Sequence, residues 1–312
     1  MSCRCGYRPI SRGSQWLLAR MAQFIRTKFT GSTMQRLAIS QITTKPLTLE
    51  QDLALCKTLD CGLEIDEKKL SVDRSEAHDQ LAYIKESGVR ITSIQPKTLT
   101  VFPSASAPQP ESPEARLENL IGSVDLFSKY WKGLPLVTNT GADPDGNEYK
   151  VWEGCVQRYQ TLANHAEDQG MKIALEALGP SLMNANSILF AYSQAQEMAA
   201  SVDKKSFGVC LDIYNSWQDP ALIESITSEK LFLVQLADWR RPRSLHDRRA
   251  LGDGQISFSP ILRRLLECGY KGDYVLEIFS DSVSDSLWRD ASTISLAIEA
   301  STRIFDSLSL QA

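Results

Sequence analysis

Several features that would point to particular protein classes are missing from this sequence. Three histidines, His78, His165 and His246, are too few and too scattered for a histidine-rich zinc cluster. No apolar run approaches the ~18 residues of a membrane-spanning helix, so we expect a soluble protein without a membrane partner. The seven cysteines are an odd set without disulfide spacing, which favours a reducing compartment such as the cytoplasm.

Acidic residues are missing from the start of the chain, because no Asp or Glu precedes Glu50. Residues 1–35 instead carry Arg and Lys, and their amphipathic stretch 16–29 resembles a mitochondrial transit peptide. The alternative is a plain N-terminal extension of a cytoplasmic protein. The whole chain has a formal net charge of −4, so residues 36–312, without the six basic residues of the extension, carry about −10, and this acidic balance argues against a nucleic-acid partner.

Residues 36–312 read as one domain in which short apolar runs alternate with helical patterns. A chain of 312 residues that is 43% hydrophobic can bury a full core. The apolar runs have the length of buried parallel strands and occupy residues 36–44, 62–65, 91–96, 134–142, 172–178, 207–213, 231–237 and 273–279. The helical patterns occupy residues 48–61, 75–87, 116–133, 151–170, 188–202, 221–226, 259–269 and 286–308. Eight such units predict an α/β fold, a (β/α)₈ TIM barrel.

Four polar side chains mark the ends of the last four predicted strands. They are Glu176, Asp212, Gln235 and Glu277. In a barrel these strand ends converge on one mouth, where catalytic groups are found. Three carboxylates there would repel one another unless a divalent cation lay between them, so the pattern predicts a metal site.

The short sequence segments around these four residues point to a particular protein family more specifically than the spacing of the residues does. MKIALEALGP, VCLDIYNSW, LVQLADW and DYVLEIFSD resemble the xylose isomerase-like TIM barrel superfamily of sugar isomerases and epimerases. Within it, they resemble the group that includes inosose isomerase, ketose 3-epimerases and 3-dehydroshikimate dehydratase. The resemblance implies that Glu176, Asp212, Gln235 and Glu277 bind a divalent metal. His is usual at the third position, and the amide oxygen of Gln235 favours Mn²⁺ or Mg²⁺ over Co²⁺ or Zn²⁺.

The resemblance also implies a reaction. Glu176 and Glu277 would act as acid and base on a small sugar, a cyclitol or a related polyhydroxy keto compound, through a metal-stabilised enediolate. Proton return would make the protein an isomerase or epimerase, whereas loss of a hydroxyl would make it a lyase of the 3-dehydroshikimate dehydratase type. A carbohydrate-binding barrel without catalysis is a third reading, since Asn215 stands where the family often has His.

Six further side chains are candidates for substrate binding. Arg248 matches the arginine that the family carries in the loop after strand seven, although a solvated loop cation would look the same. Asn215 and His246 are other candidates, and His246 could equally be a surface residue. Three more are polar at the ends of earlier strands, namely Glu64, Gln95 and Asn139. The sequence leaves a homo-oligomer open.

Overall fold

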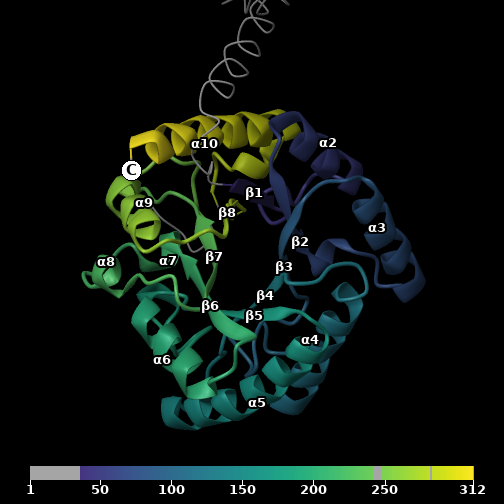
Figure 1. The fold of residues 1–312 in the computed structure, drawn as a ribbon, viewed down its shortest axis with the longest axis vertical. Helices are drawn as coiled ribbons and strands as arrows, with labels where there is room; N and C mark the ends of the chain where they lie inside the picture. The colour runs from purple at the N-terminus through teal and green to yellow at the C-terminus, as the bar shows by residue number, and fades with distance from the viewer. Residues whose placement is uncertain (1–35, 242–246, 282, 312) are drawn as a thin grey trace, which may run out of the picture. The chain divides into compact units, whose positions relative to one another are not determined.

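A computed structural model describes residues 36–241, 247–281 and 283–311. The predicted extension 1–35 and the candidate His246 lie outside these residues. Eight parallel strands close into a barrel in sequence order, and helices surround them (Figure 1). The strands are β1 (Arg36–Ser40), β2 (Gly62–Asp66), β3 (Ile91–Gln95), β4 (Pro135–Thr138), β5 (Lys172–Glu176), β6 (Phe207–Asp212), β7 (Leu231–Leu236) and β8 (Asp273–Leu276). The predicted TIM barrel is thus confirmed.

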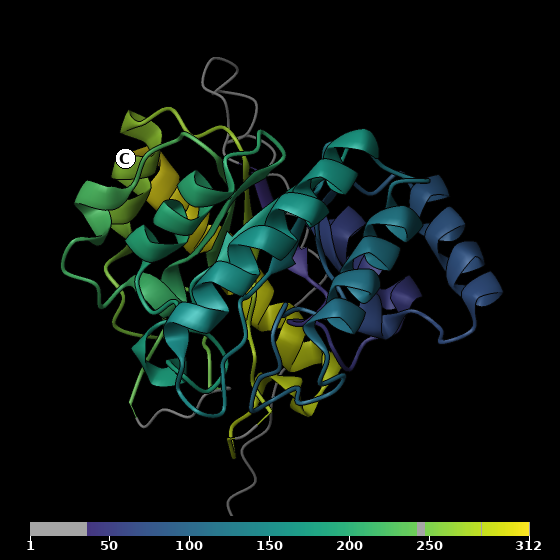
Figure 2. The same cartoon turned by 90° about the horizontal axis from the view of Figure 1, so that it is seen from below.

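The helices lie outside the barrel, as the side view in Figure 2 shows for the teal helices α4 and α5. They are α2 (Leu49–Leu59), α3 (Arg74–Glu86), α4 (Pro113–Phe127), α5 (Glu148–Asp168), α6 (Tyr192–Val202), α7 (Ile213–Ser216), α8 (Leu222–Ser225), α9 (Phe258–Glu267) and α10 (Ala291–Gln311). Their starts follow local capping chemistry, because Thr48 and Gln51 form a capping box at α2 and Ser112 caps α4 before Pro113. In the described part of the chain, none of these helices combines the length and apolarity needed to cross a bilayer.

Some predicted boundaries were wrong. The first strand ends at Ser40 rather than at residue 44, because the chain turns there and Thr43 donates its backbone N–H to Ser40. α5 begins three residues early because Asn147 caps it. The short helix α7 was not predicted, and its N-cap is the strand-end residue Asp212.

The barrel interior is built in layers that follow the two-residue period of the strands. One apolar layer contains Ala38, Val137, Ala174, Cys210, Leu233 and Val275. Two positions further along each of these strands or just beyond its end, a polar layer follows with Ser40, Asn139, Glu176, Asp212, Gln235 and Glu277. The apolar layer therefore forms a floor below the polar mouth.

The Pro- and Ser-rich segment 102–112, between β3 and α4, forms no helix and no strand of the barrel, and one buried side chain anchors it. Arg116 of α4 is 1% exposed. Its guanidinium donates to Thr100 Oγ1 at 2.6 Å and to the carbonyl oxygens of Gln109 and Pro110 at 3.1 and 2.7 Å. This arginine satisfies backbone oxygens that the irregular segment leaves without partners.

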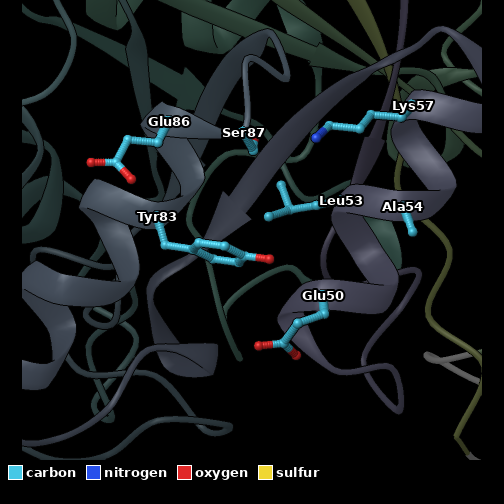
Figure 3. Close-up of a pocket in the computed structure, with 7 residues that line it drawn as sticks. All are labelled: Glu50, Leu53, Ala54, Lys57, Tyr83, Glu86 and Ser87. Atoms are coloured by element: carbon cyan, nitrogen blue, oxygen red, sulfur yellow. The ribbon is translucent and has the colours of Figure 1, made fainter.

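A groove of about 420 Å³ lies between α2 and α3, with Leu53, Lys57 and Tyr83 among its lining residues (Figure 3). It lies in the outer helical layer, so it is separate from the polar strand ends inside the barrel.

Candidate functional site

Three carboxylates meet at the mouth of the barrel. Glu176 ends β5, Asp212 ends β6 and Glu277 directly follows β8. One oxygen from each lies within 4.8 Å of the other two, and all three side chains are buried. Such a set of anionic oxygens suits a hard divalent cation, because oxygen ligands are what Mg²⁺ and Mn²⁺ prefer. The residues present therefore fit the metal that the sequence predicts.

Burial and mutual repulsion disfavour the charged forms of the two glutamates. Desolvation, followed by the charge of Asp212, raises the pKa of Glu176 to about 8. Desolvation also raises the pKa of Glu277 well above its usual range, although Arg248 opposes the shift. A divalent cation at the cluster would favour the ionised forms of both groups.

Arg248 neutralises part of this charge. Its Nη2 lies 2.9 Å from Asp212 Oδ2 and its Nη1 lies 2.8 Å from Glu277 Oε2. The guanidinium also lies over the rings of Tyr214 and Phe279, 4.5 and 5.1 Å from their centroids. Arg248 is only 6% exposed, so it lies in the mouth and is not a solvated loop cation.

Three side-chain amides donate hydrogen bonds from their nitrogen atoms to the same carboxylates. Asn215 Nδ2 lies 3.0 Å from Glu176 Oε1 and 2.7 Å from Asp212 Oδ2. Asn139 Nδ2 lies 3.2 Å from Glu176 Oε2, and Gln95 Nε2 lies 3.1 Å from Glu277 Oε1. Among the described residues, no donor is bonded to the carbonyl oxygens of these three amides. Those oxygens can therefore accept hydrogen bonds from hydroxyl groups of a ligand.

The side-chain amide of Gln235 directs its nitrogen toward the carboxylate cluster, whereas a metal ligand would direct its oxygen there. Its Nε2 lies 3.2 Å from Glu277 Oε1, whereas its Oε1 accepts from Cys210 Sγ at 3.2 Å. A half-turn about the terminal bond would exchange the two atoms and present the oxygen to the cluster. Gln235 therefore lies beside the carboxylates, and its role as the fourth metal ligand stays a prediction that requires this rotation.

Glu64 lies in the barrel interior, yet it is completely covered. It accepts from Ser93 Oγ at 2.6 Å and from Gln95 Nε2 at 3.4 Å. Gln95 contacts both Glu64 and Glu277, so it links Glu64 to the carboxylate cluster. Direct contact between Glu64 and a substrate stays a prediction.

Sequence reasoning missed several residues around the site. Ser93 and Cys210 precede Gln95 and Asp212 by two positions, so strand periodicity places each pair on one face of a strand and could have found them. Tyr214 and Phe279, which flank Arg248, follow strand ends in loops or short helices. The periodicity of strands and helices does not predict that these two rings pack against the same arginine.

The segment between β7 and α9 holds Arg248 in position. Asp238 and Arg249 exchange backbone hydrogen bonds of 2.8 and 2.9 Å, and the backbone N–H of Arg248 donates to Phe279 O at 2.8 Å. Arg249 also forms an ion pair with Asp285, with Nη2 2.8 Å from Oδ1. These contacts join the segment after β7 to the one after β8.

Gly254→Ala should destabilise this segment. An added Cβ would lie 2.3 Å from Asp238 Oδ1, the oxygen that accepts from the backbone N–H of Ile256 at 3.0 Å. We expect the free energy of unfolding to fall by about 1–3 kcal/mol in urea titrations. Gly122→Ala in α4 is the matched control, since nothing lies within 4 Å of its added Cβ. Equal effects at the two positions would contradict the close packing.

Comparisons with known proteins now identify the family. Residues 57–299 match the family described as "Xylose isomerase-like TIM barrel", and the chain belongs to it. A curated 3-dehydroshikimate dehydratase of Pseudomonas putida is 28% identical over 234 residues, which cover 70% of this chain and 34% of the relative. An inosose isomerase of Halalkalibacterium halodurans is 26% identical over 157 residues, 48% of this chain and 53% of the relative. The chain thus spans about a third of the dehydratase.

Solved structures show the same fold at low identity. A protein of Sinorhizobium meliloti 1021 has a TM-score of 0.74 at 21% identity, covering 87% of this chain and 98% of that one. The IolI protein, described as binding a zinc atom, has a TM-score of 0.66 at 18% identity over 88% of this chain and 98% of its own. D-psicose 3-epimerase from Clostridium cellulolyticum H10, solved with D-tagatose, has a TM-score of 0.69 at 17% identity, covering 88% and 99%.

Proposed function

We propose that the protein is a divalent-metal-dependent isomerase or epimerase of a small polyhydroxy keto compound, such as a sugar or cyclitol. The observation that carries the proposal is the pair of buried glutamates, Glu176 and Glu277, in one carboxylate cluster. Around the cluster, the three unclaimed amide oxygens suit a ligand with several hydroxyl groups. The isomerase among the curated relatives supports the reaction class.

The metal would be held by Glu176, Asp212 and Glu277, with Gln235 joining after its amide rotates. When bound, the cation polarises the carbonyl of the substrate and so acidifies the neighbouring C–H bond. One glutamate takes this proton, which breaks the C–H bond and leaves an enediolate of the substrate. Donation of a proton by the other glutamate to the opposite face would give an epimer, and return of the abstracted proton to the adjacent carbon would give an isomer. Arg248 and the amides of Gln95, Asn139 and Asn215 orient the ligand.

Glutamate has to carry the proton transfer in this proposal. Asn215 stands where the family often has His, and an amide cannot shuttle a proton near neutral pH. Asn215 instead donates to both Glu176 and Asp212, so its contacts are those of a residue that orients the carboxylates.

A lyase is the second candidate, and the similarity to a 3-dehydroshikimate dehydratase over 70% of the chain favours it. The first step would be the same proton abstraction. The intermediate would then lose a hydroxyl group, with cleavage of a C–O bond and release of water. A carbohydrate-binding barrel without turnover remains the third candidate, because of Asn215.

A substrate screen separates these candidates. Purified full-length protein is first analysed for bound metal and is then incubated with ketoses, inososes and 3-dehydroshikimate in the presence of Mn²⁺ or Mg²⁺. Products of unchanged mass but altered chromatographic mobility would support the isomerase or epimerase, and products lighter by one water would support the lyase. Binding without turnover would support the third candidate. Absence of metal binding would refute the proposed mechanism.

Gln235→His tests the fourth ligand. An imidazole nitrogen is a softer donor than an amide oxygen, so we expect the metal preference to move from Mg²⁺ and Mn²⁺ towards Co²⁺ and Zn²⁺ by about tenfold or more in relative affinity. Calorimetric titration with each of the four ions measures the preference without a substrate. An unchanged preference would remove Gln235 from the set of ligands.

A further inference from the structure

Glu64 is a buried carboxyl group that the proposed reaction does not use. It lies on β2 with no exposed surface, and Ser40 and Ser93 are its register neighbours on β1 and β3. Its hydrogen-bond partners are the neutral side chains of Ser93 and Gln95, at 2.6 and 3.4 Å, and of Ser40. Within the described residues no Lys or Arg forms an ion pair with it. An ionised carboxylate in such a place would carry a desolvation penalty that these neutral hydrogen-bond partners offset only in part.

The ionisable groups around Glu64 make ionisation still harder. Asp66 lies on the same strand, and the charge of Asp66 acts on Glu64 in the same direction as burial. Glu277, which follows β8, contacts the same Gln95 amide, and the thiol of Cys210 lies on β6. Arg248 is already committed to Asp212 and Glu277, so it leaves Glu64 without a counter-ion.

We propose that Glu64 is a neutral carboxylic acid in the folded protein and acts as a positioning residue, which holds the Gln95 amide against Glu277. The Nε2 of Gln95 donates to Oε1 of Glu64 and to Oε1 of Glu277, so it bridges the two carboxyl groups. The acid proton then lies on Oε2 of Glu64, which donates it to Ser93 Oγ 2.6 Å away. Because Glu64 is neutral, the amide can span the two groups without placing a fourth negative charge beside the cluster of Glu176, Asp212 and Glu277. The carbonyl oxygen of Gln95 then remains available to a ligand.

Burial raises the pKa of Glu64, which is consistent with this assignment. The direction of the pKa shift determines how the stability of the folded protein changes with pH. A carboxyl group whose pKa is raised on folding contributes its full stability below its unfolded pKa of about 4.3 and loses it as the pH rises towards the folded pKa. Glu64→Gln has nearly the same shape and is neutral at every pH, so it should not show this loss.

The first test is the pH dependence of urea unfolding for the full-length wild type and for Glu64→Gln, between pH 5 and 8. We expect the folding equilibrium constant of the wild type, relative to the variant, to fall by up to about tenfold for each pH unit until the folded pKa is passed. Glu229→Gln makes the same chemical change at an exposed position and should show no such slope. A flat ratio for Glu64→Gln would overturn the proposal. Infrared difference spectra over the same pH range should also show a protonated carboxyl band in the wild type that the variant lacks and that fades as the pH rises.

The second test addresses positioning and rests on the proposed metal site. Mn²⁺ alone is titrated into the wild type, Glu64→Gln and Glu64→Asp. The glutamine should keep the contact with Gln95 and change the affinity by less than about twofold, whereas the shorter aspartate should weaken it by about tenfold or more. Strong weakening by Glu64→Gln would show that Glu64 acts as an anion and would overturn the proposal. If no form of the protein binds Mn²⁺, the proposed function fails, while the unfolding test still decides the charge of Glu64.

Discussion

Glu277→Gln should lower kcat by about 100-fold or more in the presence of saturating metal, because the change removes a proton-transferring carboxylate. Mn²⁺ affinity should fall as well, by more than about tenfold, since one of the three anionic ligands becomes a neutral amide. The shape of the side chain is conserved, so Gln95 and Gln235 keep a partner at this position. The activity is measured with the substrate found by the screen, and the affinity is measured by calorimetry.

The exposed Glu229→Gln is again the matched control and should leave both kcat and Mn²⁺ affinity unchanged. Circular dichroism confirms that the Glu277 variant is folded before its activity is interpreted. Full activity of Glu277→Gln in metal-replete buffer would refute the assignment of Glu277 as acid and base. Lost activity with unchanged Mn²⁺ affinity would instead restrict Glu277 to proton transfer and exclude it as a ligand.

The strands allowed the most reliable predictions from the sequence. A barrel places the end of every strand at the same mouth, so a polar residue at the end of each apolar run was enough to bring Glu176, Asp212 and Glu277 together. The two-residue period of a strand also explains the apolar floor below them. This much follows from local pattern and closure of the sheet alone.

Some features of the site could not be predicted from the sequence, because they depend on contacts between loops, whose side chains do not alternate with a regular period. The ring stack around Arg248 joins Tyr214 and Phe279, which follow different strands. The orientation of the Gln235 amide depends on the thiol of Cys210 below it. The hydrogen bonds of Glu64 with Ser93 and Gln95 were not predicted either, because strand position alone does not give the partners of a buried side chain.

Arg248→Gln should be the most destabilising of the site variants. Arg248 bridges Asp212 and Glu277, and removal of one partner from a buried ion pair leaves uncompensated charge that costs about 3–5 kcal/mol. The packing of the guanidinium between Tyr214 and Phe279 is lost at the same time. We therefore expect a lower urea midpoint for unfolding in buffer that contains a chelator.

Saturating Mn²⁺ should reduce this loss, because a cation bound by the same carboxylates replaces the missing positive charge and stabilises the folded state through its binding free energy. Arg303→Gln is the control, since Arg303 is exposed on α10 and, within the described residues, pairs with Glu299 one helical turn away. If Arg248→Gln were as stable as this control in chelator, the buried ion pairs would not contribute to folding. If Mn²⁺ failed to restore stability while it stabilised the wild type, Arg248 would be required for metal binding itself, and its role would extend beyond orienting a substrate.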